Sequence, residues 1–291
     1  MLAVLLALAA AAGFGGGDYA AGLAARRASV VRVTVLAEVT SAALLMCVVP
    51  FISSQAPSLT SVLWGIVAGA SGVAGAMALY LGFRHAAFSV ASSISAVGSA
   101  AFSVLAGVAL GEQPNALALA GIALALPAIV AVSVPASRSA SPDQHGQVHQ
   151  HKQAVGVGLG LAAGAGFGMF FIGLNEAGSV NDLWPIVISQ IAAMVTVTCV
   201  AVATRDLRLP PTGARQLSVL TGVMGATGTT MFFLSTHHGL LAVTAVITSL
   251  YPALTILLAR VISGERLTAL RIIGLSLAAA SVALIAASGT G

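Results

Sequence analysis

The sequence predicts an all-α integral membrane protein with ten transmembrane helices, arranged as two inverted five-helix repeats. Three observations predict this fold. Hydrophobic residues make up 58% of the 291-residue chain and charged residues only 7%. The apolar residues form ten runs, each long enough to cross a hydrocarbon core of about 30 Å. Several glycines and one charged residue also return at a fixed offset of 153 residues.

The ten runs are separated mostly by short connections, which leave no room for a soluble catalytic domain. The predicted spans cover residues 2–22, 30–50, 60–82, 87–110, 115–135, 154–175, 183–203, 214–235, 240–262 and 267–287. The first run is apolar like a signal peptide, but no basic segment precedes it and it carries one copy of the repeat. We therefore expect it to remain as a span.

Glycine positions carry the evidence for duplication. The offset pairs Gly13-Phe14-Gly15 with Gly166-Phe167-Gly168, Gly72 and Gly75 with Gly225 and Gly228, and Gly111-Glu112 with Gly264-Glu265. Glycines allow close helix contacts in lipid, so their return at one spacing indicates a duplicated unit. We place repeat 1 at residues 1–135, a polar linker at 136–153 and repeat 2 at 154–291.

The odd number of spans in each half makes the second copy enter the membrane from the opposite side. Inverted repeats of this kind are typical of secondary transporters, whose binding sites lie near the midplane between the repeats. Alternating access uses this symmetry, because two mirrored halves can exchange conformations about a central site.

The basic residues lie at or next to connections between the predicted spans. All 12 Lys and Arg lie at odd-numbered connections. The positive-inside rule then predicts that the 136–153 linker is cytoplasmic and that both termini are external. Although the pI is about 9.7, the basic residues form no continuous face, so we expect no nucleic-acid partner.

The C-terminal stretch from Leu240 to Ala286 resembles the EamA-type domain of the drug/metabolite transporter superfamily. Its matching motifs are Thr244-Ala245-Val246-Ile247, Tyr251-Pro252 and Gly264-Glu265-Arg266-Leu267. Phe14-Gly15 and Phe167-Gly168 stand where that family often has Trp-Gly. The resemblance implies ten helices in two inverted halves and a carrier of small metabolites or drugs, often an exporter. Many members are thought to have cytoplasmic termini, whereas the charges here predict the reverse.

Two acids lie inside predicted spans. Glu38 is about nine residues into the second span, close to the midplane. An ionised carboxylate there costs roughly 2.5–3.5 kcal/mol, so it needs a partner, water or a proton. We interpret Glu38 as a proton-coupling residue or, alternatively, as part of a structural hydrogen bond. Asp18 is either a cavity residue or an interfacial acid neutralised by Arg26 or Arg27.

Hydroxyl side chains recur at helical spacing on the fourth and ninth spans. They are Ser92, Ser95, Ser99 and Ser103, and Thr244, Thr248, Tyr251 and Thr255. Such stripes bind substrate or join neighbouring helices. Phe14 and Gln190 are further substrate-binding candidates.

Two predicted bends favour a gating role for the same spans. Pro252 has no N–H for the Thr248 carbonyl, so it should kink the ninth span. Gly98-Ser99 offers a bend at the matching place in the fourth span.

Motifs for other chemistry are missing from the sequence. It contains no P-loop, nucleophile elbow or HExxH motif, and the linker histidines suit a solvated loop better than a metal site. We expect no cofactor, no metal and no enzymatic activity. Glu112 and Glu265 begin the fifth and tenth spans, where a carboxylate stabilises a helix N-terminus.

The sequence thus favours a multi-pass cell-membrane transporter that exports small organic metabolites or drugs by alternating access, with protons as the coupling ion. Its expected partners are the lipid bilayer and a small-molecule substrate, and we expect a monomer or a homodimer. The alternatives are an uncoupled facilitator and a membrane-embedded lipid-modifying enzyme. Such an enzyme would require clustered acids or histidines at one interface, and the sequence shows no such cluster.

The topology is tested by single-cysteine labelling. In a background lacking Cys47 and Cys199, an impermeant thiol reagent applied to intact cells should label Gly291→Cys and leave Ser141→Cys unlabelled. Permeabilised cells provide the control, because both cysteines should then react. The opposite labelling pattern would reverse the orientation.

Overall fold

A computed structural model describes residues 1–53, 56–85, 88–133, 146–179, 181–263 and 268–289. For residues 80, 82–85, 88–93, 146–154, 259 and 263 it describes the backbone alone. These described residues form eleven helices and no strand. The helices are α1 (Leu2–Ala25), α2 (Val30–Ile52), α3 (Leu59–His85), α4 (Phe88–Ala109), α5 (Ala116–Ser133), α6 (Gly146–Glu176), α7 (Trp184–Ala203), α8 (Thr212–Thr236), α9 (Leu241–Thr248), α10 (Tyr251–Ser263) and α11 (Ala269–Ala287).

The helices match the predicted spans. Among the described residues, nine segments are long and apolar enough to cross a membrane, and one of them, Leu241–Ile262, joins α9 and α10. A further apolar segment, Ile94–Ala109 of α4, is shorter than these nine. With α4 included, the described residues form ten candidate membrane spans. Helices suit this environment because they satisfy every backbone hydrogen bond without water. The predicted fold class is confirmed, while α6 begins at Gly146, inside the segment predicted as linker.

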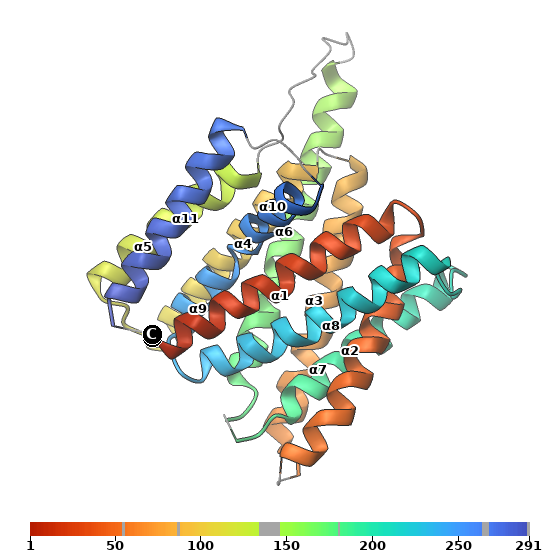
Figure 1. Ribbon diagram of the computed structural model, residues 1–291, viewed down its shortest axis with the longest axis horizontal. Coiled ribbons are helices and arrows are strands. Elements are labelled where there is room, and N and C mark those ends of the chain that lie inside the picture. The colour runs from red at the N-terminus through yellow and green to blue at the C-terminus, as the bar shows by residue number, and fades with distance from the viewer. Residues whose placement is uncertain (54–55, 86–87, 134–145, 180, 264–267, 290–291) are drawn as a thin grey trace.

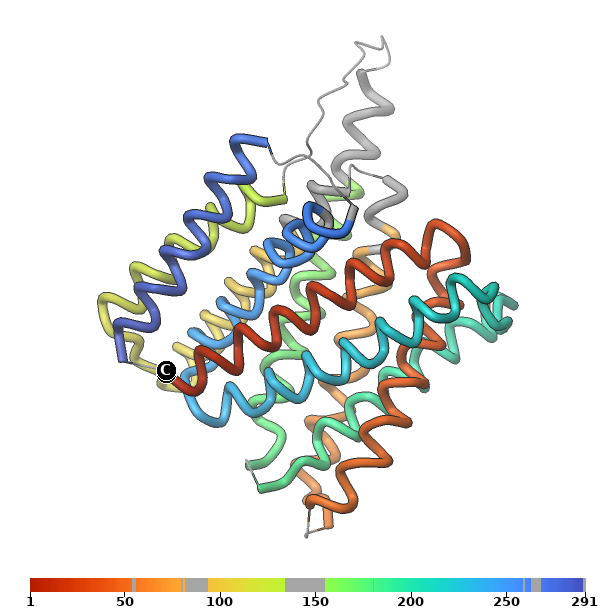
Figure 2. Tube along the Cα trace, viewed as in Figure 1, coloured from red at the N-terminus to blue at the C-terminus, as the bar shows by residue number. Residues whose placement is uncertain are grey.

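The packing of the helices repeats between the two halves. α1 packs against α8 as its equivalent α6 packs against α3, and α2 packs against α8 as α7 packs against α3. Three further pairs, α5 with α11, α2 with α7, and α4 with α9, join equivalent helices of the two repeats. Figure 1 shows α5 and α11 side by side at one edge, and Figure 2 shows the same interleaving along the Cα trace. The two repeats therefore form one bundle in which each half packs mainly on the other.

Two glycine crossings hold this arrangement. A Cβ placed on Gly13 of α1 would lie 2.7 Å from the Cα of Gly228 on α8. A Cβ on Gly166 of α6 would lie 2.7 Å from the Cα of Gly75 on α3. Both distances are far below van der Waals contact, so only glycine lets these backbones touch. The two crossings are related by the 153-residue offset, which shows that the same contact is built twice.

The ninth span is interrupted as its proline predicts. α9 ends at Thr248 and α10 begins at Tyr251, and Leu250 donates to the Ile247 carbonyl at 3.1 Å in a tightened turn between them. Pro252 follows directly and has no N–H to continue the helical pattern.

The fourth span is not interrupted at the matching place, so the expected pair of bends is not symmetric. α4 runs without a break through Gly98 and Ser99. A glycine keeps its N–H and can continue a helix, and Gly98 is used here for close packing: a Cβ on it would lie 3.3 Å from the Cα of Gly164 on α6.

The crossings are tested by a matched pair of substitutions. Gly13→Ala should lower the apparent Tm in detergent, because the new methyl group meets the Gly228 backbone. Gly158→Ala is the control: a methyl group there would have no other atom within 4 Å, and alanine favours a helix by roughly 1 kcal/mol. Equal Tm values for the two variants would contradict the proposed contact.

Candidate functional site

A cavity of about 180 Å³ lies between the two repeats. Its lining comes from α1, α2, α3, α6, α7 and α8, together with Tyr251 at the start of α10. These helices include both members of each glycine crossing, so the crossings determine the separation of the walls. Most of the lining is apolar, and it contains two carboxyl groups, those of Asp18 and Glu38.

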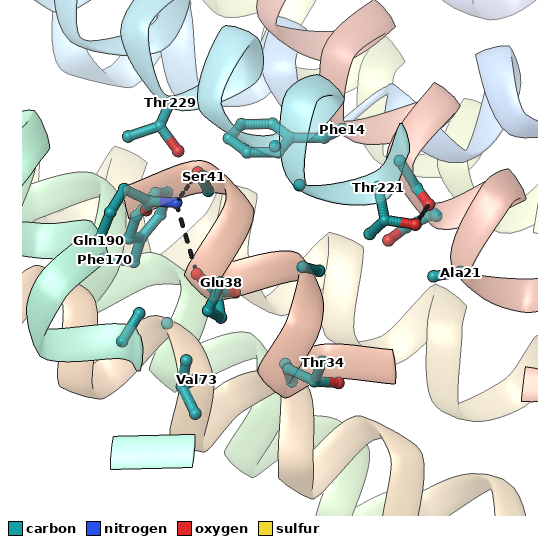
Figure 3. Close-up of a pocket in the computed structure, with 18 of the residues that line it drawn as sticks. Phe14, Ala21, Thr34, Glu38, Ser41, Val73, Phe170, Gln190, Thr221 and Thr229 are labelled. Atoms are coloured by element: carbon teal, nitrogen blue, oxygen red, sulfur yellow. Dashed lines mark hydrogen bonds between the residues drawn. The ribbon is translucent and has the colours of Figure 1, made fainter. Parts of the chain in front are cut away.

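The Glu38 carboxyl meets an amide from the other repeat (Figure 3). The Nε2 of Gln190 on α7 donates to the Oε2 of Glu38 at 3.4 Å and also to the hydroxyl of Ser41, one turn further along α2. A hydrogen bond inside the bundle, one of the two alternatives for Glu38, is therefore present. The coupling role stays a prediction.

Glu38 and Gln190 occupy equivalent positions of the two repeats. A Cβ on Gly222 would lie 2.8 Å from the Cβ of Thr40, and a Cβ on Gly69 would lie 2.9 Å from that of Ala192. The two glycines are 153 residues apart but their partners are 152 apart, so α7 is shifted by one residue relative to the other helices. With this shift Glu38 corresponds to Gln190, and the hydrogen bond joins the two halves at their pseudo-two-fold axis.

Asp18 lies on α1 and its side chain is exposed to the cavity. In the described part of the chain it has no hydrogen bond and no ion pair, and neither Arg26 nor Arg27 neutralises it. Of the two alternatives for Asp18, the cavity residue matches its position.

Aromatic rings form one wall of the cavity. Phe14 and Phe170 meet edge to face, with ring centroids 6.2 Å apart and planes at 75°. Phe170 is followed by Phe171, whose ring centroid lies 4.4 Å from that of the fully buried Phe232. Tyr251 also lines the cavity. The predicted residues Phe14, Gln190 and Tyr251 thus join the two acids at one site.

On the side of the even-numbered connections, the Phe171 and Phe232 rings pack together, and polar contacts join the helix ends beyond them. At the even-numbered connections, Ser61 donates to Asp182 at 2.5 Å and a ring nitrogen of His237 lies 3.1 Å from the Gly178 carbonyl. Glu112 accepts from the backbone N–H groups of Leu241 and Ala242, at 2.5 and 2.9 Å. This carboxylate therefore caps α9 rather than α5, a long-range contact that the sequence did not indicate.

Toward the odd-numbered connections the cavity continues. Its lining reaches Ala21, Val33 and Leu79, which lie within two turns of the helix ends on that side. Beyond them Arg32 of α2 pairs with Asp206 after α7, with Nη2 and Oδ1 2.5 Å apart. The Ser29 hydroxyl and the Arg32 guanidinium hold the pKa of the Asp206 carboxyl below its usual range.

The Phe171–Phe232 contact has a repeat counterpart. By the 153-residue offset, Phe171 and Phe232 correspond to Asp18 and Leu79. The first pair is packed ring on ring and only its Phe171 lines the cavity, whereas both members of the second pair line the cavity. Equivalent positions of the two halves thus differ in how they border the cavity.

Of the described residues in the two hydroxyl stripes, Tyr251 lines the cavity and the others lie outside it. The side chains of Ser95, Ser99, Ser103, Thr244 and Thr248 are buried where α4 packs on α9. The hydroxyls of Ser99 and Ser249 lie 3.2 Å apart across this contact, whereas those of Ser95, Ser103 and Thr248 have no described hydrogen-bond partner. The role of the stripes toward substrate stays a prediction. The side chain of Ser92 lies outside the described residues.

Several lining residues were missed at the level of sequence. They are Ser41, Thr34, Thr221, Thr229 and the phenylalanines of α6. A signal existed for some of them: Ser41 is one turn from Glu38 on the same face of α2, and Phe167 is the repeat partner of Phe14. Among the residues that the structure describes, no group of three or more His, Cys, Asp or Glu side chains is placed to hold a metal ion.

Comparisons with known proteins agree with the fold and assign part of the chain to a family. Residues 154–287 match the model of the EamA-like transporter family. A solved structure, described simply as a crystal structure of a protein, superposes with a TM-score of 0.78 over 98% of both chains at 14% identity, a likeness that concerns the fold alone. No curated protein matches the sequence.

Proposed function

We propose that this chain, whose residues 154–287 match the model of the EamA-like transporter family of the drug/metabolite transporter superfamily, carries a small organic solute through its central cavity across the cell membrane by alternating access. The observation that supports this most directly is the cavity at the pseudo-two-fold axis, which both repeats line. A solute site between inverted repeats is the arrangement that alternating access requires.

The unequal ends support a two-state exchange. The Phe171 and Phe232 rings are in contact toward one end, whereas the equivalent Asp18 and Leu79 both line the cavity. If the two halves exchange conformations, the second pair approaches while the first separates, and the cavity becomes accessible from the opposite side.

The size and side of the cavity support export of a small metabolite. A volume of about 180 Å³ is below the roughly 300–1,000 Å³ of sites for drug-sized ligands. The cavity extends toward the odd-numbered connections, which the charge distribution predicts to be cytoplasmic. A solute would therefore enter from the cytoplasm in this conformation.

Proton coupling through Glu38 distinguishes an active exporter from an uncoupled facilitator. The carboxyl lies inside the bundle, and its described partner is a neutral amide at 3.4 Å, so no described side chain balances its charge. A group of this kind is stabilised by taking up a proton and can release it when the cavity changes sides. The rival lipid-modifying enzyme is less supported, because both cavity acids lie inside the bundle and not at one interface.

Glu38→Gln tests the coupling. The variant keeps the shape of the side chain but removes its titration, so pH-gradient-driven flux in proteoliposomes should fall about tenfold or more, while equilibrative exchange measured at saturating solute survives. The control is Glu176→Gln, which changes an acid outside the cavity that accepts from Asn175. Full gradient dependence in Glu38→Gln would exclude Glu38 as the coupling residue.

Pro252→Ala tests the gating role of the break between α9 and α10. Restoring an N–H should let the two segments join, and transport should slow by about tenfold, equal to a barrier change of ~1.4 kcal/mol. Insertion and Tm should be unchanged or improved. Pro127→Ala, within α5 and away from the cavity, is the control. Equal transport rates for the two variants would remove the gating role.

A further inference from the structure

We propose that the cavity selects small organic cations, with the positive charge of the solute held by Asp18 and Glu38 against the aromatic wall. This inference rests on the proposed function, since the bound cation would be the transported solute. It adds a chemical class that the family match does not supply.

The charges of the lining give the first argument. The cavity is lined by two carboxyl groups and by no Lys, Arg or His side chain among the described residues. Asp18 has no described partner, and Glu38 has a neutral one. In a medium of low dielectric constant, a cationic solute would offset this uncompensated negative charge, whereas an anionic solute would be repelled by it.

The direction of the hydrogen bonds gives the second argument. Several side-chain donors around the cavity are used by the protein itself: Thr34 donates to the Val30 carbonyl at 3.0 Å, and Thr221 donates to the Leu217 carbonyl at 2.9 Å. The Ser41 and Thr229 hydroxyls remain available. The Gln190 amide donates to Ser41 and Glu38. The acceptors are in surplus, because Oε1 of Glu38 and both carboxyl oxygens of Asp18 accept no hydrogen bond from the described residues.

A site with free acceptors and few free donors favours a solute that brings positive charge or N–H groups. A carboxylate or phosphate solute would need several donors from the protein, and the cavity offers few. Figure 3 shows the Gln190 nitrogen directed at Ser41 and Glu38.

The aromatic wall gives the third argument. Phe14, Phe170 and Tyr251 line the cavity that the two acids share. Ring faces attract ammonium groups, more strongly where water is excluded. Acids combined with rings recognise a cation that also has apolar surface, so an organic ammonium ion fits better than a hydrated metal ion.

Binding of matched probes tests the inference. Choline, its neutral isostere 3,3-dimethylbutan-1-ol and the anion 3,3-dimethylbutanoate have similar shapes and differ in charge. Calorimetry on the purified full-length protein in detergent should give choline at least a tenfold lower Kd than the alcohol, and no binding of the anion. Equal or tighter binding of the alcohol or the anion, or no binding of choline to folded protein, would overturn the proposal.

The variants connect the selectivity to the two acids. Asp18→Asn and Glu38→Gln should each weaken choline binding at least tenfold and leave binding of the neutral alcohol unchanged. Glu176→Gln, outside the cavity, should leave choline binding unchanged. Size-exclusion profile and Tm identify variants that remain folded, and Phe14→Leu, which removes a ring without touching the charges, should also reduce the preference for choline over the alcohol. Unchanged choline affinity in all three cavity variants would contradict the assignment.

Flux measurements separate this inference from the proposed function. Counterflow of a labelled neutral or anionic solute through the protein, without competition by choline, would uphold transport and overturn the cation class. Choline binding with the predicted selectivity but no choline flux in proteoliposomes would uphold the cation site and overturn the transport function.

Discussion

The two glycine crossings, Gly13 on Gly228 and Gly166 on Gly75, are the contacts on which the rest of the structure depends. In lipid, helices gain little from hydrophobic burial, and close backbone approach supplies much of the attraction between them. Each crossing joins helices from different repeats, so the chain packs as one interleaved bundle. Because α1, α3, α6 and α8 are drawn together at these points, their remaining surfaces enclose a cavity in the middle of the bundle.

The two repeats pack in the same way but differ in the side chains at the cavity. Glu38 and Gln190 stand at equivalent positions and meet at the pseudo-two-fold axis, yet only the first is ionisable. Asp18 likewise corresponds to Phe171 in the other repeat. Duplication therefore supplies two halves with equivalent packing, and divergence of a few side chains places both carboxyl groups of the cavity in repeat 1. The phenylalanines of α6, in repeat 2, complete the wall.

The two ends of the molecule differ in how strongly they are joined. At the even-numbered connections, hydrogen bonds of Asp182, His237 and Glu112 link neighbouring helices beyond the packed phenylalanine rings. At the other end, the described ion pair between Arg32 and Asp206 links α2 to the segment after α7, beyond a cavity that still separates the helices. A change of side must break the first set of contacts. Glu112 is part of that set because it connects the segment before α5 to the start of α9.

The sequence by itself determined the membrane class, the span positions, the duplication and the break at Pro252, because these follow from local properties: apolar length, residue spacing and a missing N–H. It also indicated Glu38, Asp18 and Gln190, since polar residues inside apolar runs are costly unless they are used, Tyr251 through its place in a hydroxyl stripe, and Phe14 through the family resemblance. Only the tertiary structure decided that these five share a cavity while the described serines of α4 and the threonines of α9 lie outside it. The one-residue shift that makes Glu38 equivalent to Gln190 and the reach of Glu112 to α9 likewise depend on how helices far apart in sequence rotate and cross. Such rotations are set by side-chain contacts between helices, which no single apolar run contains.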